Sequence, residues 1–127
     1  MEESDALKIL YQYKMRLVNN PLFIDLKYED DCLKLVVSLL DNKEANKFTL
    51  YIDSKDDTLY LSDHKEISMF FDDYNDEVSK SFYQCVAKRS ALDFNDFEFF
   101  HEINLDSIDQ YINHFKECIG IILVESN

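Results

Sequence analysis

The hydrophobic periodicity changes at Pro21, and this change restricts the fold more than any other feature of the sequence. Residues 4–18 carry apolar side chains at helical spacing, with Ser4 as a candidate N-cap. Pro21 disfavours helix at the residue before it, so this helix should end at about residue 19. From residue 22 to 28 apolar side chains recur at every second position, which is typical of a strand.

Three further segments have the composition of strands. Residues 32–40, 47–53 and 58–62 are rich in β-branched and apolar side chains. The connections between neighbouring segments are short and polar, so they cannot hold the crossover helices that parallel strands need. The sequence therefore predicts an antiparallel meander over roughly residues 22–62.

Helical spacing returns after Asp63. The sequence predicts a short helix carrying Ile67, Met69 and Phe70 towards the core, a longer helix from about residue 75 to 90, a strand at 96–103 and a last helix capped by Asn104. The expected fold class is α+β, a single domain over residues 1–127 with an antiparallel sheet of four to five strands. The expected order is α-β-β-β-β-α-β-α, with an N-terminal helix and C-terminal helices.

Charge is the strongest functional signal in the composition. The chain has 26 acidic and 13 basic residues, a formal net charge of −13. Direct binding of nucleic acid or of an anionic membrane surface requires the opposite sign. Residues 56–77 hold eight of the carboxylates and four aromatic rings. Such a surface either keeps the protein soluble or meets a basic partner.

No catalytic or metal-binding motif is evident. One glycine cannot make a phosphate-binding loop or a dinucleotide fingerprint. His114 and Cys118 are four residues apart, but no second close ligand pair completes a zinc site. Residues 73–77, "DYNDE", lack the glycine and distant glutamate of a calcium loop. The three cysteines suit reduced, mostly buried thiols. We therefore expect no catalytic residues, no cofactor and no metal, and a protein that is not an enzyme.

Two tyrosines fall on the side of the predicted sheet opposite its leucine and isoleucine face. These are Tyr51 and Tyr60, each close to acidic residues. They either lie under a covering helix or form part of an interface, where tyrosine supplies contact area at low entropic cost.

The segment "LYLSD" ends in a pattern that resembles a family of uncharacterised bacterial and phage domains. In that family a strand ends in Y-x-L-[ST]-D and is followed by an acidic residue, a glycine and a helix. Tyr60, Leu61, Ser62 and Asp63 match the pattern, whereas His64 and the lysine after it replace the acid–glycine pair. The resemblance implies a fold and no activity.

The function expected from these observations is inhibition of a basic, nucleic-acid-binding protein by direct binding, as in DNA mimics and anti-CRISPR or anti-restriction proteins of phages. An immunity protein that neutralises a toxin such as a nuclease is the first alternative, and a small enzyme acting on a nucleotide or metabolite is the second. The residues expected to contact the partner lie in or beside predicted turns and helix starts: Glu29, Asp30, Asp31, Asp53, Asp56, Asp57, Tyr60, Asp72, Asp73, Asp76 and Glu77.

The expected location is the cytoplasm, because the N-terminus lacks the basic region and apolar stretch of a secretory signal. Asn, Asp, Ile, Lys, Phe and Tyr are abundant, as AT-rich codons would produce. This bias is typical of a low-GC bacterium or one of its phages.

Overall fold

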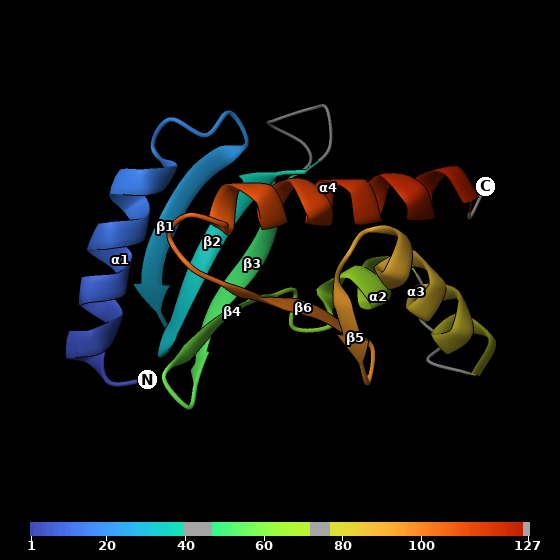
Figure 1. The fold of residues 1–127 in the computed structure, drawn as a ribbon, viewed down its shortest axis with the longest axis horizontal. Coiled ribbons are helices and arrows are strands. Elements are labelled where there is room, and N and C mark those ends of the chain that lie inside the picture. Colours follow the sequence, from blue (N-terminus) through green and yellow to red (C-terminus); the bar gives the residue numbers. More distant parts are fainter. Residues whose placement is uncertain (40–46, 72–76, 126–127) are drawn as a thin grey trace.

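The computed structural model describes residues 1–39, 47–71 and 77–125, and within them six strands form one antiparallel sheet (Figure 1). The strand order is β1-β2-β3-β4-β6-β5. The elements in chain order are α1 (Glu3–Leu17), β1 (Phe23–Glu29), β2 (Cys32–Ser38), β3 (Lys47–Lys55), β4 (Thr58–Ser62), α2 (Glu66–Phe71), α3 (Glu77–Arg89), β5 (Asp93–Asn95), β6 (Glu98–Ile103) and α4 (Ile108–Glu125).

Strand alternation divides the sheet into a core face and an outer face. On the core face Leu35 lies opposite Leu50, and Ile52 lies opposite Leu61. Helix α4 crosses this face (Figure 1), and its Phe115 is fully buried. Burying a side chain of this size contributes about 1.5–3 kcal/mol, so the contact between α4 and the sheet is a main source of stability.

Helix α1 packs beside β1 through a narrow set of side chains. Ala6, Tyr13 and Leu17 are buried, and the Arg16 Nε donates a hydrogen bond of 3.0 Å to Asp109 of α4. The prediction that Ser4 is the N-cap is wrong. The helix begins at Glu3, and its N-cap, Glu2, makes no side-chain hydrogen bond to the helix.

The predicted α+β class and the order of elements are confirmed, with one strand more than expected. The segment 96–103 was predicted as a single strand, but the chain turns at Asp96 and Phe97 and pairs β5 with β6. Aromatic packing stabilises this hairpin, because Tyr83 of α3 contacts Phe94 and Phe97.

Four side chains that were predicted to be buried are not fully buried. In α2 Ile67 is fully buried, whereas Met69 and Phe70 are exposed. Cys85 is exposed and Cys32 half-buried, so Cys118 is the only fully buried thiol.

Three hairpin turns are built from residues with positive φ, and none of these residues is glycine. The two-residue turns of the three hairpins are residues 30–31, 56–57 and 96–97, and all six residues have φ between 48° and 65°. Such turns favour Asn-Gly or Asp-Gly. Five of these six residues are aspartate, which tolerates the left-handed region better than most side chains.

Replacing Ala91 by glycine should stabilise the protein by about 1 kcal/mol. Ala91 follows α3 with φ 55°, and the Leu92 N–H bonds to the Ala87 carbonyl at 2.9 Å, as in a Schellman cap. Glycine removes the Cβ strain at that position, and this gain exceeds its greater entropy in the unfolded chain. Urea unfolding measures the change. The same substitution at Ala87, inside α3, should destabilise the protein; if both variants lose stability, the cap is not strained.

No helix in the described part of the chain has both the length and the apolar character needed to cross a lipid bilayer.

Candidate partner-binding surface

Two acidic hairpin turns lie at the same end of the sheet. Asp30 and Asp31 join β1 to β2, and Asp56 and Asp57 join β3 to β4. Because β2 and β3 are adjacent and antiparallel, the two turns project side by side beyond the strand ends (Figure 1, lower left). We call Glu29 and these four aspartates the acidic tip.

The two turns of the acidic tip differ in how far their charge is compensated. The Lys34 ammonium lies 3.3 Å from Glu29 and 3.0 Å from Asp30, so one cation serves two carboxylates of the first turn. Within the described residues, no hydrogen bond or ion pair engages the exposed side chains of Asp56 and Asp57. The second turn therefore presents two uncompensated carboxylates to solvent.

Turn conformation explains only part of this composition. Glycine and asparagine adopt the positive φ of these turns most readily, and aspartate also tolerates it. Asparagine would meet the conformational need without adding charge. The carboxylates of Asp56 and Asp57 thus have no conformational role that a neutral side chain could not fill.

The outer face of the sheet continues from the acidic tip. Tyr60 lies opposite Asp53 across β4 and β3, and its ring contacts the edge of Phe100 on β6. All three side chains are half-buried, and α4 packs on the other face (Figure 1). Helix α4 therefore does not cover Tyr60, whereas the Tyr51 hydroxyl donates a hydrogen bond of 2.7 Å to Glu66 at the start of α2. The face presents aromatic rings beside acids.

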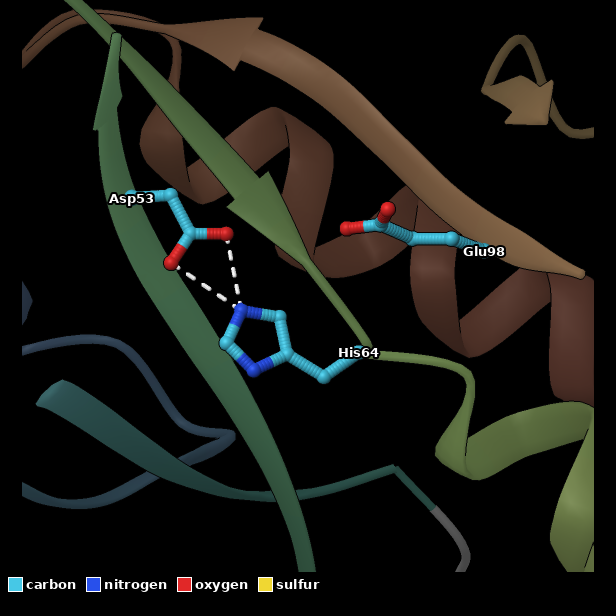
Figure 2. A group of neighbouring side chains, drawn as sticks. All are labelled: Asp53, His64 and Glu98. Carbon is cyan, nitrogen blue, oxygen red and sulfur yellow. Dashed lines mark hydrogen bonds and ion pairs between the residues drawn. The ribbon is translucent and has the colours of Figure 1, made fainter. Parts of the chain in front are cut away.

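A cluster of Asp53, His64 and Glu98 occupies the middle of this outer face. Figure 2 shows the three side chains converging from β3, from the turn after β4 and from β6. The His64 Nε2 lies 2.8 and 3.0 Å from the two carboxylate oxygens of Asp53. The imidazole also stacks on the Tyr51 ring, with centroids 3.8 Å apart and planes 3° from parallel. Ser62 donates its hydroxyl hydrogen bond to Glu98.

The turn that carries His64 is fixed by a buried carboxylate. Asp63 accepts hydrogen bonds from the backbone N–H groups of Lys65, Ile67 and Phe99, at 2.9 to 3.1 Å. Burial raises the pKa of Asp63 to about 7, although these three amides act to lower it. The Ser62 hydroxyl accepts the His64 N–H at 3.0 Å. The final Ser and Asp of the "YLSD" segment are therefore structural residues.

The surrounding carboxylates favour the imidazolium form of His64. Burial by itself would lower the pKa of His64, but the hydrogen bond to Asp53 and the charges of Asp53, Glu98 and Asp63 outweigh it and raise the pKa. At pH below this raised pKa the cluster contains one cation between two carboxylates. The outer face is thus less acidic at its centre than at the acidic tip.

Replacing Asp53 by asparagine should lower the pKa of His64 in an NMR titration. The raised pKa of His64 also determines how the stability contributed by the Asp53–His64 pair changes with pH. The imidazolium is stabilised in the folded state, so this contribution is fully present below the ordinary histidine pKa of about 6.5 and is lost as pH rises through the folded-state value. The variant should therefore lose more stability at pH 6 than at pH 9. Equal losses at both pH values would show that the pair is not ionic.

The same three residues are the group that could hold a metal ion in the described part of the chain. Their ligand atoms lie within 4.8 Å of one another, and one imidazole with two carboxylates suits a divalent transition metal. Their donor atoms also satisfy one another and Ser62 through hydrogen bonds. His114 and Cys118, the pair considered from sequence, are not in this group: Cys118 is buried, and burial raises the pKa of its thiol.

The structure brings together most of the residues predicted to contact a partner. The acidic tip, Asp53 and Tyr60 form one continuous region. Glu77 does not join it, because it begins α3 at the other end of the long axis (Figure 1). Asp72, Asp73 and Asp76 lie outside the described residues.

Sequence reasoning missed His64 and Glu98 as members of this face. His64 follows Asp63 in the turn, and its side chain folds back over Tyr51. Glu98 reaches the cluster because β6 pairs with β4, and the paired residues are 38 or more positions apart in the sequence. No local pattern encodes that pairing, although the alternation of β3 already placed Tyr51 and Asp53 on one face.

Comparison with protein families, with curated proteins and with solved structures found no match to this chain.

Proposed function

We propose that the protein acts by binding a basic protein through the acidic tip and the adjoining outer face of the sheet. The observation that supports this most directly is the pair of exposed carboxylates on the β3–β4 turn, which no side chain of the described residues engages, next to a second acidic turn. Mutual repulsion among exposed carboxylates is weak, tenths of a kcal/mol for each pair, so the fold tolerates it. A cationic groove in a partner removes that repulsion and adds attraction.

The proposed partner is a protein whose groove normally binds nucleic acid. Such grooves are lined with Arg and Lys that contact phosphates, and rows of carboxylates on a rigid hairpin pair can occupy them. The half-exposed Tyr60 and Phe100 next to the acids supply the aromatic contact area that protein interfaces favour. Binding is the whole activity in this proposal, as in phage proteins that inhibit host defence.

Capture from bacterial lysate followed by competition tests the proposal. The immobilised protein should retain a basic protein, identified by mass spectrometry, which duplex DNA displaces and which elutes as salt rises from about 0.05 to 0.5 M. The isolated partner should then bind the free protein in the same salt-dependent way. Retention that neither DNA nor salt disturbs would contradict the proposal. A toxin nuclease as the retained protein would instead favour the immunity alternative.

A further inference from the structure

Helix α1 carries a second apolar stripe on the side that faces away from the core. Leu7, Tyr11, Met15 and Val18 are 48, 70, 63 and 62 % exposed, respectively. Their spacing of four, four and three residues places all four on one face of the helix, over a length of about 16 Å. The buried side chains Ala6, Tyr13 and Leu17 belong to a different face.

This stripe is unusual for a solvated helix. Scattered exposed apolar residues are normal, but a continuous row on one helix face marks an interaction surface. Tyrosine and methionine, which occupy the middle of the row, are both enriched in protein interfaces. Among the described residues, the packing of α1 on β1 leaves about half or more of each side chain in the row exposed.

Charge indicates which partner fits the stripe. Residues 1–22 contain three acidic and three basic residues, so residues 23–127 carry the whole net charge of −13. A basic partner would find no excess negative charge on α1. A second copy of the chain repels the first least strongly if the two meet through their neutral helices.

The distribution of charge along α1 indicates the orientation. Glu3 and Asp5 lie in its first turn and Lys14 lies in its last turn, whereas Arg16 of the last turn pairs with Asp109 of α4 within the same chain. Two such helices side by side in parallel would align like charges and like ends of the helix dipoles. An antiparallel pair places opposite signs and opposite dipole ends together.

We propose that the protein forms a homodimer through the exposed apolar stripe of α1, with the two α1 helices antiparallel about a two-fold axis. Such an axis gives an isologous interface, in which the same row of side chains is used by both copies. Leu7 of one protomer then lies towards Met15 of its partner, and the two Tyr11 side chains lie near the axis. The hairpins of the acidic tip are not part of this contact.

Sedimentation equilibrium of the purified protein tests the dimer. The mass should approach twice that of the 15.1 kDa chain as concentration rises. Tyr11→Lys should raise the dimer dissociation constant at least about tenfold, because it places two cations at the centre of an apolar contact. Val124→Lys is the matched control, because Val124 is 77 % exposed on α4 and lies outside the stripe; it should leave dimerisation unchanged. A parent that stays monomeric at all concentrations overturns the proposal.

Disulfide cross-linking tests the orientation in a Cys85→Ser background, which removes the exposed native thiol. A mixture of Leu7→Cys and Met15→Cys proteins should oxidise to mixed dimers, whereas either variant alone should cross-link poorly. Cross-linking of each variant with itself would show a parallel pair and overturn the antiparallel arrangement.

Salt separates this inference from the proposed function. Dimerisation through an apolar contact between two acidic bodies should strengthen as salt rises, because screening reduces their repulsion. Binding of a basic partner through the acidic tip should weaken over the same range. The mass is measured without any partner, so failure of either proposal leaves the other untouched.

Discussion

Replacing Asp63 by alanine should destabilise the protein by about 3–5 kcal/mol. The side chain is fully buried and accepts three backbone N–H groups, from Lys65, Ile67 and Phe99. Alanine leaves these donors without acceptors in the interior, and each unsatisfied donor costs about 1–3 kcal/mol. The turn after β4, the start of α2 and the start of β6 all depend on this one carboxylate.

Urea unfolding followed by circular dichroism measures the Asp63 effect. Asp63→Asn should be intermediate, because the amide keeps one acceptor oxygen. Asp96→Asn is the control: Asp96 is exposed and pairs with Lys65 in the same region, and asparagine removes this ion pair while tolerating the positive φ of the turn, so the midpoint of unfolding should stay unchanged. If Asp63→Ala unfolds at the same urea concentration as Asp96→Asn, Asp63 does not organise the turn.

The meander could be predicted from the sequence because strand periodicity records burial directly. Phe48, Leu50 and Ile52 alternate with polar residues, and all three are buried on the core face. The last helix is similar: its apolar residues recur at helical spacing on one face, and Ile112 and Phe115 are fully buried. In both cases one face of the element is clearly more apolar than the other.

Helix α1 shows where this reasoning stops. It has two apolar rows, one including Tyr13 and Leu17 and one including Leu7 and Tyr11, and the sequence alone does not say which row meets the sheet. The answer depends on how the helix docks against β1. Pairing between distant segments is hidden for a similar reason, so Glu98 could not be placed beside His64.

The sequence located the acidic turns correctly, but it did not show that the two turns differ in ion pairing. Turn residues are recognised locally, since paired aspartates between strand segments indicate a two-residue turn. The proximity of the two turns follows from the meander. Their difference in compensation does not, because Lys34 reaches back to Glu29 and Asp30 only through the β1–β2 pairing.

The double variant Asp56→Asn, Asp57→Gly should bind the captured partner at least about tenfold more slowly than the parent. It removes two uncompensated carboxylates and converts the turn to the Asn-Gly pair that this geometry prefers. Its unfolding midpoint should therefore equal or exceed that of the parent. Loss of binding in this variant cannot be attributed to loss of fold.

A matched variant controls for net charge. Glu77→Gln with Glu117→Gln also removes two exposed carboxylates, but on α3 and α4, away from the acidic tip. It should keep the association rate of the parent to within a factor of about two, since distant charges are screened. Equal slowing in both double variants would mean that only the total charge matters.

The association rate of the isolated partner, measured against salt concentration for the parent and both double variants, tests the central claim most directly. The account predicts a steep decline with salt for the parent and for the Glu77/Glu117 variant, and a slower, flatter dependence for the Asp56/Asp57 variant. If the Asp56/Asp57 variant binds as fast as the parent with the same dependence on salt, the acidic tip is not the partner-binding surface.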